Sequence, residues 1–321
     1  MSTYKRNIVV AIRCLVYNHE PYLRQCLDSI VMQQTDFPYF AVVHDDCSTD
    51  HSADIIREYA AKYPDKIHPI YEDFNCYKVG WKIADDKIHA AYENATYIAI
   101  CEGDDYWIDP YKLQKQVDFL ESHLDYSVCA HETMILAPNG TTKLFSDVAN
   151  NIFVSIKKTD YTPQETLTGN IFHWSSFMYR NVSDFQMPQW RYRISAGDMV
   201  YFRYYGMQGK THRFPEVMSV YRFHAKSVTK TEDVYQTELN FVSLNIKVLR
   251  LLNRYWNRQY QHLIYPIISR YYMRSLFVCW SKSGRDYALA RKMAKKAWLY
   301  NKTTFVKYLW IESYRKLKKH L

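Results

Sequence analysis

Tyr97-Ile98-Ala99-Ile100-Cys101-Glu102-Gly103-Asp104-Asp105-Tyr106 is the most informative segment of this chain. Its first half is an apolar run with the length and residue types of a buried β-strand. Three carboxylates then fall within four positions, and burying them unpaired would cost several kcal/mol per ion. A divalent cation would relieve that repulsion, because Mg²⁺ and Mn²⁺ take carboxylate oxygens and often bridge to substrate phosphates. An acidic turn before the helix that starts near Pro110 is the alternative.

A second apolar run, residues 40–44, also ends in acids, at Asp45 and Asp46. In an open α/β sheet, ligands bind outside the carboxyl ends of the strands. Two parallel strands would therefore bring Asp45, Asp46, Asp104 and Asp105 to one edge of the sheet. The sequence predicts at that edge a site for a phosphate ligand held through a metal ion.

Strand and helix patterns alternate along the chain. Strands are expected at 8–16, 39–44, 67–71, 97–101, 126–134, 169–180 and 211–222, and helices at 20–34, 52–63, 81–94, 112–123 and 197–206. The alternation predicts an α/β fold with a Rossmann-like, mostly parallel central sheet flanked by helices. No G-x-G-x-x-G follows the first strand, so the usual dinucleotide fingerprint is absent.

Charge is divided unevenly between the two parts of the chain. Residues 1–231 carry 24 Lys and Arg against 28 Asp and Glu, whereas residues 232–321 carry 18 against 5. Such an asymmetry suggests two parts with different partners. With 321 residues, we expect one large domain over 1–231 and a basic helical region over 232–321.

The cysteines and the N-terminus indicate a cytosolic protein. The seven cysteines are scattered and include no C-x-x-C pair, a pattern that favours reduced thiols over disulfides. Residues 1–6 lack the charged-then-apolar pattern of a signal peptide. No run of about 18 apolar residues predicts a membrane span.

The last forty residues combine positive charge with aromatic side chains. From Lys282 onward there are 12 Lys and Arg and 2 Asp and Glu. Basic helices with aromatic and leucine residues on one side lie in anionic membrane interfaces. We therefore expect a peripheral membrane dock. Nucleic-acid binding is a rival, although no recognised motif supports it, and a packed helical tail with a solvated basic face is another.

Five segments occur in the order found in one enzyme family. They are Val16-Tyr17-Asn18, Asp45-Asp46-Cys47-Ser48-Thr49-Asp50, the acidic turn with Lys112-Leu113-Gln114-Lys115-Gln116, Gly197-Asp198, and Tyr221-Arg222-Phe223-His224. Over about residues 6–230 the chain resembles glycosyltransferase family 2, the inverting enzymes with a GT-A fold. The resemblance implies a metal-dependent transferase. It would move a sugar from a nucleotide-sugar, with UDP as the expected nucleotide, to a glycan hydroxyl on a lipid-linked surface polysaccharide.

The resemblance also implies roles for particular residues. Asp46 would accept a hydrogen bond from the nucleotide base, with Tyr17 packed beside it, and Asp104 would lie near the ribose or the metal. Asp105 would bind Mn²⁺ or Mg²⁺, His224 would lie near the metal and diphosphate, and Asp198 would be the general base.

Two positions depart from the family pattern, and two residues have simpler interpretations. Leu15 stands where some members carry a hydroxyl residue that contacts the nucleotide, and the base segment at 196–198 reads Ala-Gly-Asp where many members have Glu-Asp. From the residues alone, Asp198 is also a suitable N-cap of a helix, and His224 is a structural histidine.

Two other functions remain open at this point. A sugar nucleotidyltransferase would carry a Gly-rich loop with Arg and Lys after the first strand, where this chain has Tyr17-Asn18-His19-Glu20. A non-catalytic carbohydrate- or membrane-binding scaffold would have no need of Asp46, Asp104, Asp105 and Asp198 together. We therefore expect a cytoplasmic glycosyltransferase, peripheral on the inner face of the membrane.

Overall fold

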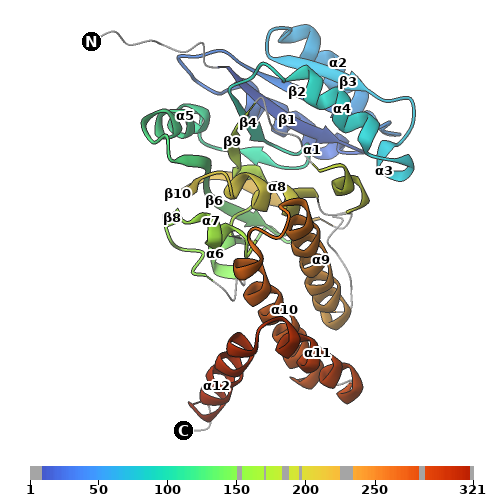
Figure 1. The fold of residues 1–321 in the computed structure, drawn as a ribbon. Helices are drawn as coiled ribbons and strands as arrows, with labels where there is room; N and C mark the ends of the chain where they lie inside the picture. Colours follow the sequence, from blue (N-terminus) through green and yellow to red (C-terminus); the bar gives the residue numbers. More distant parts are fainter. Residues whose placement is uncertain are drawn as a thin grey trace.

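The computed structural model describes residues 9–149, 154–169, 171–182, 188–194, 197–224, 234–281 and 286–318. The boundary expected after residue 231 lies outside these residues and stays a prediction. One mixed sheet runs through the body of the molecule, and the C-terminal helices extend away from it (Figure 1).

One half of the sheet is entirely parallel. Its strands lie in the order β3-β2-β1-β4 and cover Ile67–Tyr71, Tyr39–Asp45, Val10–Val16 and Tyr97–Ile100. They are connected by helices α1 (Glu20–Val31), α2 (Ser52–Lys62), α3 (Cys76–Val79) and α4 (Lys82–Ala91). The predicted α/β alternation is confirmed here, and the carboxyl ends of all four strands lie at the same edge.

The other half of the sheet contains the antiparallel pairs. The strand β9 (Met178–Arg180) runs antiparallel to both β4 and β6 (Tyr126–Leu136), and β6 is parallel to β10 (Lys210–Arg222). Short strands β5 (Tyr106–Trp107), β7 (Thr142–Leu144) and β8 (Asp160–Tyr161) add antiparallel edges. The β6–β7 hairpin turns at Gly140, whose φ of 80° favours glycine. Short and medium helices complete this half: α5 (Lys112–Ser122), α6 (Phe145–Val148), α7 (Pro163–Thr166), η2 (Gln189–Arg193) and α8 (Gly197–Gly206).

The strand expected at 169–180 is wrong over most of its length. The structure has a 3₁₀ turn, η1 (Trp174–Ser176), and of the described residues in this range only the three of β9, Met178–Arg180, belong to a strand. The His173 side chain accepts the N–H of Ser175, and the Ser176 hydroxyl donates to the His173 carbonyl at 2.6 Å. These local bonds offer the backbone an alternative to the ladder. The alternation of apolar residues over 169–180 therefore comes from the burial of this segment and does not indicate a strand.

Apolar layers cover both faces of the sheet. Alternate residues of β1 point to opposite layers, as the period of a strand requires. Ile12 and Cys14 pack with Leu23 of α1, whereas Ala11 packs with Ile88 of α4 on the other face. Helices α1, α2 and α5 thus cover one face, and α4, α8 and part of α9 (Val234–Tyr255) cover the other.

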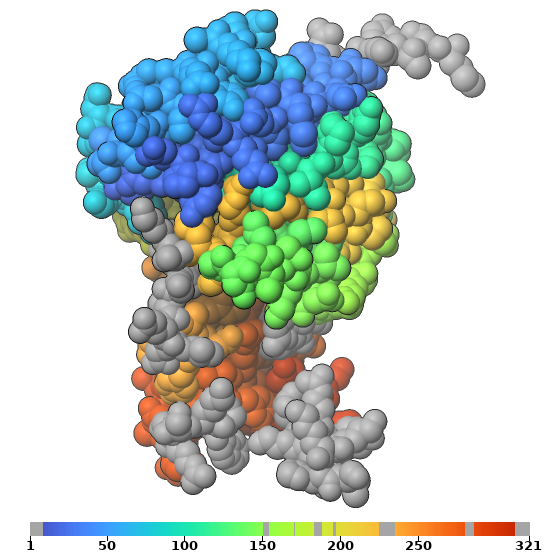
Figure 2. All heavy atoms as spheres, turned by 180° about the vertical axis from the view of Figure 1, so that it is seen from behind, coloured from blue at the N-terminus to red at the C-terminus, as the bar shows by residue number. Residues whose placement is uncertain are grey.

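The C-terminal region is helical, as its sequence predicts. The helices are α9 (Val234–Tyr255), α10 (Gln261–Ser281), α11 (Tyr287–Tyr300) and α12 (Lys302–Lys318), and they share a separate apolar cluster. From behind, the orange and red helices lie beneath the blue-to-yellow body of the protein (Figure 2). Among the described residues, no helix has the length and hydropathy needed to cross a membrane.

Candidate active site

The acidic turn lies beside the carboxyl end of β1, as the parallel topology predicts. The Gly103 N–H donates to the Leu15 carbonyl at 2.9 Å, and the Asp46 N–H donates to the Val16 carbonyl at 2.9 Å. The last residues of β1 therefore hold the two acidic segments on either side of them. The predicted convergence at one edge is confirmed, and the positions of individual side chains decide what that edge can bind.

Asp105 is buried and poorly compensated. Its side chain is 3 % exposed, and its Oδ1 accepts one backbone N–H, from Arg222, at 3.1 Å. The Arg222 guanidinium instead donates to the Asp104 carbonyl oxygen at 2.6 Å and stacks over the Tyr106 ring. Burial, and next the neighbouring Asp104, raise the pKa of Asp105 well above its usual value. A carboxylate in this state would gain from a nearby cation.

Asp104 lies between two histidines from distant segments. The Nε2 atom of His224, just after β10, is 3.1 Å from Asp104 Oδ2, and the Nε2 atom of His19, just after β1, is 3.8 Å from the same oxygen. The His224 ring also packs on the Tyr22 ring, with 4.8 Å between centroids. The structure thus places His224 beside the acidic turn. It also places His19 there, a residue for which the sequence predicts no role.

A third histidine, His173, faces Asp105 but does not neutralise it. Its Nδ1 is 4.0 Å from Asp105 Oδ2, and that nitrogen accepts the N–H of Ser175 at 3.3 Å. The neutral ring therefore carries its proton on Nε2. Burial lowers the pKa of His173 to about 4, so the ring is uncharged at neutral pH. His173 consequently contributes shape and polarity at this edge and no counter-charge.

Glu102 differs from the two aspartates because it has partners of its own. The indole N–H of Trp174 donates to Glu102 Oε1 at 2.9 Å, and Arg13 Nη1 lies 3.4 Å from the same oxygen. Burial nevertheless raises the pKa of Glu102 to about 7, against the lowering effect of Arg13. Glu102 is thus held by the protein, which leaves Asp104 and Asp105 as the carboxylates available to a ligand.

Asp46 anchors a loop at the nucleotide side of the predicted site. Its two carboxylate oxygens accept the N–H groups of Cys76 at 2.6 Å and of Tyr77 at 3.1 Å, and these residues begin α3. A carboxylate has about four lone-pair positions, so it can accept further bonds. Tyr17, at the end of β1, is 37 % exposed and open to a ligand.

Asp198 lies in the first turn of α8 and is partly exposed; residue 196 lies outside the described residues. The protein atoms around the carboxyl group remove part of its hydration and raise its pKa, while the Met199 N–H lowers it. Trp174 connects this helix with the acidic turn, since its ring packs against Tyr201 and Phe202 of α8 while its indole donates to Glu102. One side chain therefore fixes α8 relative to the acidic turn.

The residues at this edge fit a metal ion that is held jointly by protein and substrate. Within the described ranges, no three His, Cys, Asp or Glu side chains form a group that could hold a metal ion by themselves. Mg²⁺ is usually bound by one or two carboxylates together with substrate phosphates and water. The poorly compensated Asp105 and the neighbouring Asp104 provide that donor set, with His224 Nε2 3.1 Å from Asp104 Oδ2.

Comparisons with known proteins agree with this architecture. The family model described as glycosyl transferase family 2 matches residues 14–186. The uncharacterized protein Rv1520 of Mycobacterium tuberculosis is 31% identical over 227 residues, which are 68% of this chain and 60% of that protein. The uncharacterized glycosyltransferase alr2836 of Nostoc is 26% identical over 220 residues, which are 65% of this chain and 62% of that protein. The chain thus spans about 60% of the length of these relatives.

A solved structure shares the fold over nearly the whole chain. TarS residues 1–349 from S. aureus, in complex with UDP-GlcNAc, aligns with a TM-score of 0.53 at 17% identity, covering 96% of this chain and 92% of that one. At this identity the likeness bears on the fold, which includes the C-terminal extension.

Proposed function

Because the chain belongs to glycosyl transferase family 2, we propose that it moves a sugar from a nucleotide-sugar to a hydroxyl of a glycan acceptor, with inversion at the anomeric carbon. The observation that carries the proposal is the buried and poorly compensated Asp105, with the partly exposed Asp104 next to it, at the carboxyl edge of the parallel strands. UDP is the first donor nucleotide to test, and the structural likeness to TarS, which was solved with UDP-GlcNAc, supports that choice.

Asp105 would hold a divalent cation, Mn²⁺ or Mg²⁺, with Asp104 and His224 beside it. When bound, the cation supplies Lewis-acid stabilisation of the charge that develops on the leaving diphosphate. The chain's own part is to present two carboxylate oxygens at a fixed edge. The backbone N–H of Arg222 orients Asp105 for this role, at 3.1 Å from Oδ1.

Asp198 would act as the general base. In the proposed step the acceptor oxygen forms a bond to the anomeric carbon while the bond from that carbon to the diphosphate oxygen breaks. The acceptor proton passes to the Asp198 carboxylate. A carboxyl group whose pKa is raised by burial is a stronger base than a solvated aspartate, which suits proton transfer near neutral pH.

Asp46 and Tyr17 would bind the nucleotide. The carboxylate of Asp46 keeps lone pairs for a base N–H in addition to its two bonds to α3, and the exposed ring of Tyr17 offers a packing surface. Because Asp46 also anchors α3, its loss would disturb the loop as well as the base contact. Asp46 variants are therefore poor single tests of the nucleotide role.

The test is a panel of nucleotide-sugars assayed for sugar release and transfer with and without Mn²⁺. Metal-dependent turnover of one UDP-sugar is the expected result. UDP binding without turnover of any donor would favour the scaffold alternative, and metal-dependent formation of a nucleotide-sugar from a sugar phosphate would favour the nucleotidyltransferase.

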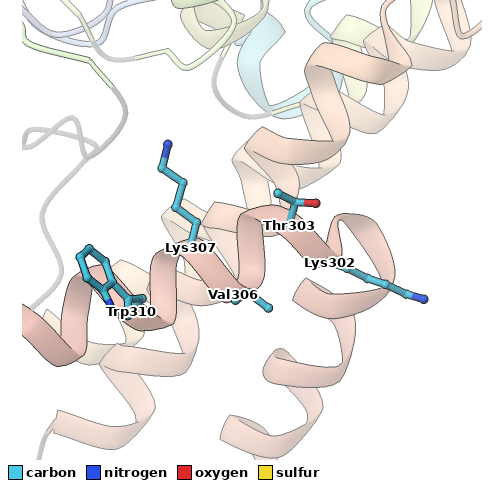
Figure 3. Close-up of a pocket in the computed structure, with 5 residues that line it drawn as sticks. All are labelled: Lys302, Thr303, Val306, Lys307 and Trp310. Atoms are coloured by element: carbon cyan, nitrogen blue, oxygen red, sulfur yellow. The ribbon is translucent and has the colours of Figure 1, made fainter.

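The exposed face of α11 and α12 supports a second part of the proposal, docking on an anionic membrane at its cytoplasmic side. Trp298, Leu299 and Trp310 are 41%, 69% and 69% exposed. A shallow hollow of about 560 Å³ on α12 is lined by apolar, polar and basic side chains, which Figure 3 shows: Lys302, Thr303, Val306, Lys307 and Trp310. Aromatic and basic residues on one helix face suit an anionic interface, where each basic residue near the surface is worth about 1 kcal/mol. The acceptor would then be a lipid-linked glycan.

Vesicle flotation tests the docking. The protein is expected to float with vesicles that contain anionic lipid and to remain behind with neutral vesicles. Trp310→Ala should weaken flotation, whereas the control Tyr111→Ala, which removes a 49% exposed ring far along the sequence, should not. Equal flotation of the two variants, or binding to RNA in place of vesicles, would contradict the docking.

A further inference from the structure

The His19 ring packs directly against the acidic turn. It occupies space that is free because residue 103 is a glycine. A Cβ atom at residue 103 would lie 2.8 Å from His19 Nδ1 and 2.9 Å from Val16 Cγ2. Contacts this short do not occur for real Cβ atoms, so any side chain at 103 would displace the ring. The glycine in the acidic turn and the histidine after β1 therefore form one packed unit.

The backbone around His19 is fixed by neighbouring elements. The His19 N–H donates to the Ser52 hydroxyl at 2.9 Å, and the Glu20 N–H donates to Asp50 Oδ2 at 3.1 Å, which ties the start of α1 to the start of α2. The His19 carbonyl accepts the N–H groups of Tyr22 and Leu23 in the first turn of α1. The ring is thus presented from a rigid position.

The surroundings of the ring decide which nitrogen carries hydrogen. Nδ1 is buried and has no hydrogen-bond partner among the described residues. An N–H at that position would lose its hydration without gaining an acceptor, and buried N–H groups without an acceptor are rarer in folded proteins than acceptors with an unused lone pair. Nε2 therefore carries a hydrogen in the neutral ring, and it also does so in the protonated ring.

The Nε2 atom lies beside the acidic turn without a hydrogen bond of normal length. It lies 3.8 Å from Asp104 Oδ2, beyond hydrogen-bond distance, while His224 Nε2 approaches the same oxygen at 3.1 Å. A donor that lies near the Asp104 carboxylate without a hydrogen bond of normal length is suited to an oxygen that arrives with a ligand. A metal ligand would need its hydrogen on Nδ1 with an acceptor there, and Nδ1 has none.

We propose that His19 donates a hydrogen bond from Nε2 to the diphosphate of the nucleotide-sugar donor. The inference rests on the proposed function, which brings a diphosphate to Asp104 and Asp105. His19 would then hold the diphosphate in the ground state and stabilise it as the leaving group, as a neutral or charged donor acting beside the metal. His19 would bind the substrate through its phosphates and would not be a ligand of the metal.

Calorimetric titration of the full chain tests the assignment. In the presence of Mn²⁺, His19→Ala should bind UDP about 10–100-fold more weakly, the usual effect of losing a hydrogen bond to a charged group. Uridine, which has no phosphate, should bind both proteins alike, and so should Mn²⁺ alone. His19→Gln, whose amide can donate from a similar reach, should recover part of the UDP affinity. His51→Ala is the matched control, because His51 is 76% exposed at the start of the next helix.

Gly103→Ala is a second variant that moves the ring without removing it, and it should also lower UDP affinity. Unchanged UDP affinity in His19→Ala would overturn the inference, and so would a loss of Mn²⁺ binding, which would make His19 a metal ligand. If the unaltered protein itself does not bind UDP with Mn²⁺, the proposed function fails first.

Discussion

The buried lysine behind the acidic turn gives a stability prediction whose sign and size follow from its surroundings. Lys112, the first residue of α5, is fully buried. Its Nζ donates to Gln116 Oε1 at 2.8 Å and lies 4.0 Å from the centroid of the Trp107 ring. Trp107 in turn forms β5, directly after the acidic turn. Burial lowers the pKa of Lys112 from 10.5 to about 7.

The lower pKa of Lys112 in the folded state determines the direction in which stability changes with pH. Between about pH 7 and pH 10.5 the unfolded chain binds a proton that the native protein does not, so stability rises with pH across this window. Each pKa unit is worth 1.36 kcal/mol, so the whole shift corresponds to roughly 5 kcal/mol as an upper bound. Raising the pH from about 7 to about 9 should recover roughly 2 kcal/mol of this amount.

Lys112→Met removes the titrating group and should remove this rise. The variant also leaves Gln116 Oε1 without its donor, at a cost of about 1–3 kcal/mol. The pH slope is therefore the diagnostic quantity, and the absolute stability is not. Urea unfolding at about pH 7, 8 and 9 measures it, with Lys115→Met on the same helix as the control, because Lys115 is 44% exposed. The reasoning is refuted if the wild-type slope persists in Lys112→Met.

Three further predictions concern the site and the sheet. Asp198→Asn should lower kcat about 10²–10⁴-fold, the range typical of a lost general base, with UDP affinity unchanged in titrations; an unaltered kcat would leave Asp198 with only a structural role in the first turn of α8, which begins at Gly197. Trp174→Phe loses the indole N–H that donates to Glu102 and should destabilise the protein by about 1–3 kcal/mol. If kcat falls by a larger factor than UDP affinity does, Trp174 positions α8. Arg213→Met leaves Glu132 buried without its cation, 2.5 Å away, and should cost about 3–5 kcal/mol in urea unfolding.

The parallel half of the fold could be predicted from local pattern. Apolar runs with the period and length of strands alternate with helical spacing in the first hundred residues, and the strand expected at 67–71 occupies the same residues as β3. The acidic segments after β2 and β4 could be placed at one edge because parallel strands share a direction. The helix at 197–206 was also predictable from its opening Gly-Asp and its length.

The antiparallel half and the outer part of the site depend on contacts between distant residues. The alternation over 169–180 is that of a buried segment, and nothing local shows that hydroxyl and imidazole groups turn it into η1. The approach of His19 and His173 to the acidic turn is likewise set by packing. The glycine at position 103 was the one available signal, since a glycine within an acidic turn can indicate a close approach by another residue.

The binding of UDP to the unaltered protein and to Asp105→Asn, each with and without Mn²⁺, tests whether Asp105 holds a metal ion together with the nucleotide. The substitution removes a buried charge whose pKa is raised by burial, so the ligand-free variant should melt at the same temperature or a higher one. Mn²⁺ should strengthen UDP binding to the unaltered protein at least about tenfold, equivalent to 1.4 kcal/mol, and should have no such effect on Asp105→Asn. Equal Mn²⁺-dependent affinity in both proteins would contradict it.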